Sequence, residues 1–186
     1  MFQLNPVNGL RDNTTYETNP ATETRVRAIL QDPIDQVVAE INNMAALKPR
    51  CRVYHNIGQS IATTSYSTIA FNSERYNIGA LHSTTVNNSR IIFLSGGCFS
   101  GGANVEWASN INGQRILRIM LNGTTQIAVI ADSANLKDSH KQQIMFSYTF
   151  SVGDYIELQG YQDSGGSLNI NLISNYSPEM WVQKEA

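Results

Sequence analysis

Charged residues make up only 15% of this 186-residue chain, whereas they make up about 25% of an ordinary soluble domain. The formal net charge is −2, and lysine and arginine do not cluster anywhere along the chain. Nucleic-acid binding depends on such clusters to neutralise phosphates, so we expect no nucleic-acid partner. No apolar run is long enough to span a bilayer, so we expect no membrane insertion.

The first residues lack the basic region and the hydrophobic stretch of a secretory signal peptide. We therefore expect the protein to fold in a cytosol. The chain has only two cysteines, and in that compartment Cys51 and Cys98 are expected to be reduced, buried thiols that pack as small hydrophobic side chains. A disulfide between them is the alternative.

Histidine is also scarce, with three residues in the chain. None has a second ligand at the spacing of a zinc motif, so we predict no metal site. His55 falls in a strand pattern and is expected to be a hydrogen-bonded interior or interface residue. His82 and His140 fall in polar stretches and are expected to be solvated.

Motifs for catalysis or for cofactor binding are missing too. The glycine-rich residues 94–102 have no following lysine or helix, so they indicate close backbone packing or a bulge that redirects the strand rather than a phosphate cradle. Glu106 and Glu157 lie on strands with polar neighbours, which is typical of a solvated face; a converging pair for glycoside cleavage is the alternative. Three loop carboxylates leave a structural calcium ion as an alternative to solvation: Asp132, Asp138 and Asp163. We predict no catalytic residue, no cofactor and no enzyme.

The residues that replace charge are serine, threonine and asparagine, which favour turns and exposed strand faces. From residue 103 to residue 130, three alternating runs are joined by Asn112-Gly113 and Asn122-Gly123. Asn-Gly suits a two-residue hairpin turn, which needs positive φ at both positions. The stretch therefore predicts a three-stranded antiparallel meander.

Alternation assigns one face of this meander to the core. The expected core residues are Ala103, Val105, Trp107, Leu117, Ile119, Leu121, Ile127 and Val129. The opposite face carries Ile116, Met120 and Ile130 around Arg118 and is unusually apolar for a solvent side. We expect a neighbouring subunit to cover it, with Ile116 and Met120 as trimerisation contacts.

The N-terminal part divides into two segments. Residues 1–19 are polar and lack a core of their own, so they predict either a disordered tail or an extended arm that docks on a partner. Residues 20–50 hold helix-start signals at Asn19-Pro20 and Asp32-Pro33. An apolar seam of about two heptads follows: Leu30, Ile34, Val37, Ile41 and Met44. It predicts a short trimeric coiled coil, or else an amphipathic helix that packs on its own domain.

Residues 51–186 show only strand patterns, separated by glycine and asparagine. Short strands at this spacing predict a mainly β, antiparallel sandwich or jelly roll. The expected strands are residues 51–57, 65–71, 90–94, 98–107, 115–121, 124–130, 142–150, 155–161, 167–173 and 176–183, and residues 72–88 and 131–141 are expected to be outer loops.

About residues 51–175 resemble the trimeric jelly roll shared by complement one-q heads and tumour necrosis factor, in the version found on bacteriophage virion proteins. The resemblance is carried by residues 67–76, Gly97-Cys98-Phe99, residues 104–107, 115–119 and 121–124, Ser151-Val-Gly-Asp154 with its following strand, and residues 164–168. The sequence departs from the family at Ser95-Gly96-Gly97, where the family commonly has proline and a branched residue before the glycine.

The resemblance implies a bacteriophage structural protein that forms a homotrimeric fibre, spike or decoration on the virion. Its N-terminal arm would attach to other virion proteins, and its jelly-roll head would face outward, where it binds host-surface carbohydrate or serves as structure alone. Tyr76 and Tyr161 are the loop-adjacent aromatic residues expected to contact a glycan. The alternatives are a polysaccharide-degrading enzyme of the virion and a secreted bacterial adhesin.

Overall fold

The computed structural model describes residues 33–39, 48–134 and 138–185. These fall into two compact units, one ending at Leu47 and the other beginning at Lys48. In the first unit residues 33–39 are helical, as the Asp32-Pro33 signal predicts, and Ile34 and Val37 are about half exposed. The other seam residues, Leu30, Ile41 and Met44, lie outside the described residues, as do residues 1–32.

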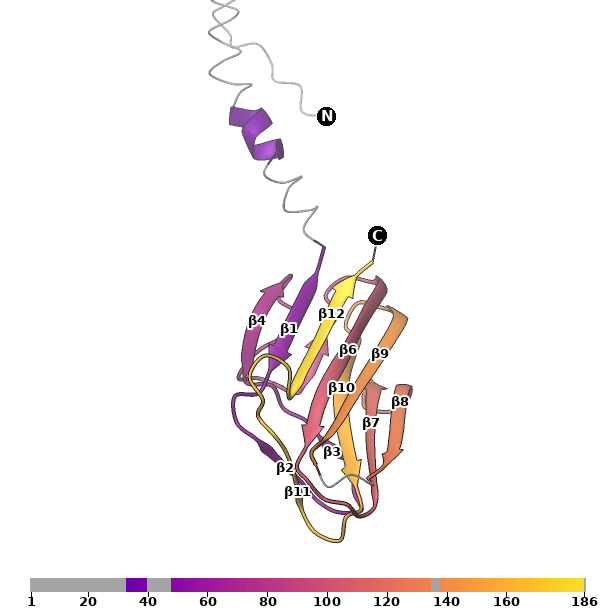
Figure 1. The fold of residues 1–186 in the computed structure, drawn as a ribbon. Coiled ribbons are helices and arrows are strands. Elements are labelled where there is room, and N and C mark those ends of the chain that lie inside the picture. Colours follow the sequence, from indigo (N-terminus) through magenta and orange to yellow (C-terminus); the bar gives the residue numbers. More distant parts are fainter. Residues whose placement is uncertain (1–32, 40–47, 135–137, 186) are drawn as a thin grey trace, which may run out of the picture. The chain divides into compact units, whose positions relative to one another are not determined.

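The second unit is a sandwich of two antiparallel sheets, shown in Figure 1. Sheet A runs in the order β2 (Gln59–Ile61), β11 (Leu168–Ile170), β6 (Gly97–Trp107), β12 (Glu179–Lys184), β1 (Arg50–Tyr54) and β4 (Ser73–Ile78), with β9 (His140–Phe150) also paired to β6. Sheet B runs in the order β3 (Ser67–Thr68), β10 (Tyr155–Gln162), β7 (Gln114–Leu121) and β8 (Thr125–Ser133), with β5 (Arg90–Ile92) also paired to β10. This is a jelly-roll sandwich, as the sequence predicts.

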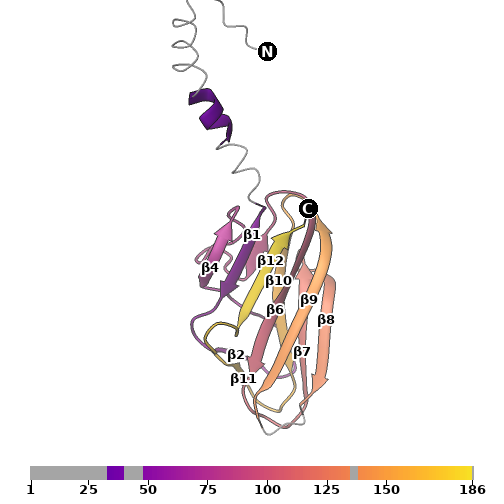
Figure 2. The same ribbon diagram turned by 45° about the horizontal axis from the view of Figure 1, so that its top comes forward.

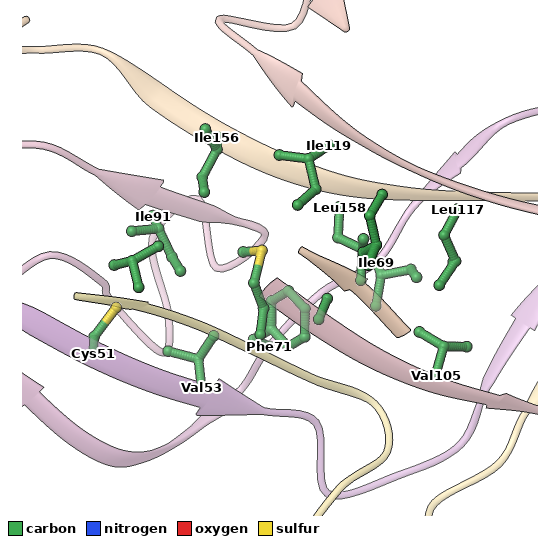
Figure 3. Close-up of a cluster of buried hydrophobic side chains, with 14 of the residues drawn as sticks. Cys51, Val53, Ile69, Phe71, Ile91, Val105, Leu117, Ile119, Ile156 and Leu158 are labelled. Atoms are coloured by element: carbon green, nitrogen blue, oxygen red, sulfur yellow. The ribbon is translucent and has the colours of Figure 1, made fainter. Parts of the chain in front are cut away.

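The core lies between the two sheets. In Figure 3, Leu117, Ile119 and Leu158 of sheet B point toward Val53 and Val105 of sheet A. All five are at most 1% exposed. Alternation places these residues on the inner face of each strand, and their burial removes apolar surface from water, at about 25 cal/mol per Å².

The predicted meander is wrong at its first turn. β7 and β8 do form a hairpin, because Asn122 and Gly123 both have positive φ (51° and 71°) as the turn type requires. At the other turn Gly113 has positive φ (72°) but Asn112 is not among the residues that do. There the chain crosses from sheet A to sheet B, so β6 pairs with β9 and β12 rather than with β7.

A second correction concerns the faces of β8. The register with β7 shifts between Ile119 and Met120, which leaves Ile127 as an extra residue. A one-residue bulge turns every later side chain to the opposite face. Ile130, expected outside, therefore packs against the core, while Val129, expected inside, is 51% exposed.

The glycine pair in the middle of β6 shows the close packing that the sequence predicts. A Cβ on Gly101 would stand 2.8 Å from the Phe146 ring on the inner face. A Cβ on Gly102 would stand 2.8 Å from the Trp181 ring on the outer face. Backbone carbonyl oxygens lie closer still, that of Trp181 to the Cβ on Gly101 and that of Ile144, at 2.5 Å, to the Cβ on Gly102, so a larger residue would disturb the neighbouring strands as well as the rings.

Part of the expected outer loop 72–88 is strand β4, the edge of sheet A. Edge strands can be short and polar, so β4 gives little alternation in the sequence. The side chain of His82, expected to be solvated, is fully buried behind β4: it bonds to Glu74 (2.8 Å) and to the carbonyl oxygen of Asn88 (3.1 Å). His140 is also mostly buried, with 14% of its side chain exposed.

Candidate functional site

One row of side chains crosses the outer face of sheet A, where β9, β6, β12, β1 and β4 lie next to one another (Figures 1 and 2). Strand register sets Met145 opposite Gly102, Gly102 opposite Trp181, Trp181 opposite Arg52, and Arg52 opposite Tyr76. We call these five residues the central row. The row crosses five strands and contains three large side chains with apolar surface, those of Met145, Trp181 and Tyr76.

The central row is open to solvent in the single chain. Met145 is 67% exposed and Tyr76 is 40% exposed, while the Trp181 ring lies on Gly102 and is half-buried. A hollow of about 270 Å³ opens beside Trp181, and Arg52, Tyr76, Asn104, Gln143 and Trp181 line it. Glycine at position 102 makes this arrangement possible because a side chain there would occupy the place of the ring.

A buried carboxylate fixes the β1 and β4 end of this face. Glu179 is fully buried, and its side chain accepts from Nε of Arg52 (2.7 Å) and Nε of Arg75 (2.5 Å). A second bond joins Arg52 to the other carboxylate oxygen at 2.9 Å, and Glu179 raises the pKa of Arg52. Two guanidinium groups share one carboxylate, so the cluster has a net positive charge.

Another carboxylate lies at the far end of the same face. Glu106 is 6% exposed and accepts a short hydrogen bond from the Tyr176 hydroxyl, with the ammonium of Lys141 at 3.9 Å. Burial raises the pKa of Glu106, but hydrogen bonds from Tyr176 and Ser139 and the charge of Lys141 outweigh it, so the pKa is lowered overall. The same contact raises the pKa of Tyr176.

The outer face of sheet B satisfies its polar groups within the chain. Arg90 pairs with Glu157 at 2.9 Å and lies over the Tyr155 ring. Arg118 donates to Gln159 at 2.7 Å and lies over the Tyr66 ring, 3.4 Å from its centroid. These charged and aromatic groups are therefore paired within the chain, and Met120 is only 5% exposed.

The structure separates residues that the sequence grouped. Ile116 and Met120 lie on the outer face of sheet B, half-buried and buried respectively, and their role in trimerisation stays a prediction. Tyr76 lies on β4 of sheet A, whereas Tyr161 lies on β10 of sheet B, packed against Tyr66 at 5.1 Å between ring centroids. The two tyrosines therefore do not form one site.

The two glutamates considered for glycoside cleavage are also far from converging. Glu106 is on the outer face of sheet A and Glu157 is on the outer face of sheet B, so the sandwich lies between them. Neither is solvated as expected: Glu106 is 6% exposed and Glu157 is 8% exposed, and each is held by a partner. The polar neighbours of each glutamate in the sequence could not show that it is buried, because its partners come from distant segments of the chain.

The described residues contain no group of three or more histidines, cysteines, aspartates and glutamates that could hold a metal ion. Within the same part of the chain, no helix has the length and apolarity needed to cross a membrane. Both cysteines are free thiols, and Cys51 is buried, as expected. Cys98, also expected to be buried, is only half-buried because it lies on the outer face of sheet A.

Sequence reasoning missed Trp181 and Met145. Each lay on an expected strand, and Trp181 is two residues from Glu179 on the same face. The available signal was the glycine pair in β6, since glycine in a strand interior often marks a place where another group approaches closely.

The strand order and the two-layer packing define a jelly roll of the tumour necrosis factor type. Among solved structures, murine APRIL at pH 5.0 aligns with a TM-score of 0.58 over 74% of this chain and 99% of that chain, at 8% identity. Eiger TNF from S. frugiperda aligns with a TM-score of 0.55 over 75% of this chain and 93% of that chain, at 7% identity. At such identities the likeness shows the fold alone. No protein-family model and no curated protein matches the sequence.

Proposed function

We propose that this chain is a non-enzymatic structural protein of a bacteriophage virion, where it forms a homotrimeric fibre, spike or decoration. The proposal joins three supports: the resemblance of residues 51–175 to phage jelly rolls, the tumour-necrosis-factor-type fold, and the central row on sheet A. The central row is the observation that carries it.

The central row suits contact with sister chains. Met145 projects from an edge strand with two thirds of its surface exposed, next to the Trp181 ring. Full burial of a methionine side chain is worth about 1.5–3 kcal/mol, and a threefold assembly repeats that gain in each chain. The outer face of sheet B offers less, because its charged and aromatic groups are already paired within the chain.

The ends of the jelly roll suit attachment to a particle. The described chain enters this unit at Lys48 and leaves it at Glu185, and Lys184 bonds to the carbonyl oxygen of Pro49 at 2.9 Å (Figure 1). Both ends therefore lie at one end of the sandwich. In the proposed arrangement the N-terminal segment fixes this end to the virion, and the loops at the opposite end face the host surface.

A comparison of two exposed residues tests the self-contact. In the full chain, Met145→Asp should convert a trimer to a monomer in sedimentation velocity at micromolar concentration, because the substitution places a charge in an apolar contact. Val129→Asp, at a similarly exposed position on sheet B, should leave the trimer intact. If Val129→Asp or Ile116→Asp dissociates the assembly and Met145→Asp does not, sheet B is the contact surface.

The virion role has its own test. Particles purified from the source of this sequence should contain the chain, in multiples of three per particle, when their proteins are quantified by mass spectrometry. Absence of the chain from purified particles would refute the virion role while leaving the trimer to be judged separately.

A further inference from the structure

A pocket of about 370 Å³ opens where three segments meet beside the edge of sheet A. Its walls come from the end of β1 and the residues after it, from β4, and from the segment between β11 and β12. The lining residues are Tyr54, Asn56, Arg75, Leu172, Ile173, Ser174, Asn175 and Ser177. Its volume falls within the range of small-molecule sites, about 300–1,000 Å³.

Arg75 is the one charged residue among those that line this pocket. Glu179 holds its Nε, and its guanidinium lies over the Tyr54 ring, 4.6 Å from the ring centroid. Within the described part of the chain, no acceptor bonds to its two terminal nitrogens. Arg52 shares Glu179, so the positive charge at Arg75 is not neutralised. A fixed guanidinium with free terminal donors suits a carboxylate.

The remaining walls suit a sugar ring. Ser174 and Asn175 are exposed, and in the described structure their side chains have no hydrogen-bond partner. Leu172 is 47% exposed and supplies an apolar wall. The hydroxyl groups of a sugar need polar partners such as Ser174 and Asn175. The C–H faces of its ring need an apolar surface such as that of Leu172.

The walls are also fixed before any ligand binds. Ile173 donates to the carbonyl oxygen of Ser177 at 2.9 Å, which closes the segment on itself. The Ser177 hydroxyl donates to the carbonyl oxygen of Asn171 and accepts from the Glu106 amide at 2.7 Å. On the other wall, Asn56 and Asn72 exchange two hydrogen bonds, of 3.0 and 2.7 Å. A preformed pocket loses less entropy on binding than one that must be ordered.

We infer that this pocket binds a carboxylated sugar, a uronic or sialic acid residue, with its carboxylate on Arg75 and its ring between Leu172 and Ser174. The inference names the class of glycan for the host contact and rests on the proposed function only for its biological setting. Binding is read in solution whatever the oligomeric state. A monomer that binds the sugar would contradict the trimer alone, and a trimer that does not bind would contradict the pocket alone.

The test titrates the full chain with methyl glucuronide and with N-acetylneuraminate, followed by saturation-transfer NMR. At least one should bind. Neutral methyl glucoside, which lacks the carboxylate, and acetate, which lacks the sugar ring, should each bind at least about tenfold more weakly. Arg75→Gln should weaken the acidic sugar by about tenfold or more. Arg118→Gln is the matched control, since Arg118 is also stacked on a tyrosine but is not among the residues that line this pocket, and it should leave affinity unchanged.

Asn175→Asp provides a second variant in case Arg75→Gln disturbs the Glu179 cluster. It adds a negative charge at an exposed lining position and should weaken the acidic sugar without changing the melting temperature. The inference is overturned if neither acidic sugar binds, if acetate binds as well as they do, or if the Arg75 and Arg118 variants bind equally.

Discussion

Replacement of Gly102 by alanine tests the packing of the central row. The added methyl group would stand 2.8 Å from the Trp181 ring and 2.5 Å from the carbonyl oxygen of Ile144. Ordinary contacts between carbon atoms are about 3.5–4.0 Å, so the ring must move. Moving the ring does not relieve the contact with the Ile144 carbonyl oxygen, so the substitution also strains the pairing of β9 with β6, which runs along the whole length of both strands.

The magnitude follows from two opposing effects. Overpacking of this kind costs about 1–3 kcal/mol. Alanine also reduces the conformational entropy of the unfolded chain, which raises the free energy of unfolding by about 0.4–1 kcal/mol. We therefore expect Gly102→Ala to lower the free energy of unfolding by roughly 1–2 kcal/mol and the melting temperature by roughly 2–8 °C.

Calorimetry and denaturant titration of the full chain at one fixed concentration would measure this change, since association also affects apparent stability. Gly166→Ala is the control, because no atom lies within 4 Å of a Cβ built there. It should raise the free energy of unfolding by about 0.4–1 kcal/mol, because only the reduced freedom of the unfolded chain acts at this position. If the two variants behave alike, the Trp181 ring does not lie on Gly102 in solution and the central row is misassigned.

Three further predictions concern single groups. Trp107→Phe should destabilise the chain by about 2–4 kcal/mol in a denaturant titration, because it removes the donor to buried Gln142 (2.8 Å) and leaves space beside it; a loss below about 1 kcal/mol would contradict this. The fold lowers the pKa of Glu106, so its charged form stabilises the chain above the ordinary glutamate value of 4.5, and this contribution is lost as the pH falls through the folded-state pKa. The stability gap between the wild type and Glu106→Gln should therefore narrow on acidification below 4.5, and a gap that widens would refute the reasoning. Burial raises the pKa of the Cys51 thiol, so an aromatic disulfide reagent should modify Cys98 alone in the folded chain and both thiols after denaturation; fast modification of both would show that Cys51 is accessible.

The sequence predicted the fold class well because alternation and turn chemistry are local. Asn122-Gly123 adopts the paired positive φ values of its turn, and the run after it pairs as expected. The same dipeptide at 112–113 failed because the partner of β6 is decided by β9 and β12, which follow much later in the chain. Pairing between strands that are far apart in the sequence cannot be predicted from a dipeptide at one turn.

The candidate site was harder to predict because its residues meet only through the sheet register. Trp181 of β12 packs on Gly102 of the neighbouring strand β6, and Glu179 joins Arg52 to Arg75 although more than one hundred residues separate it from either. A polar pattern also cannot distinguish a solvated carboxylate from one buried against a distant partner. A single bulge was enough to invert the expected faces of β8.

Sedimentation equilibrium of the wild-type full chain at micromolar concentration tests the central claim most directly, that sister chains cover the outer face of sheet A. We predict a mass of three times the 20.6 kDa chain, which Met145→Asp reduces to the mass of one. A wild-type chain that remains monomeric across this range would contradict the account.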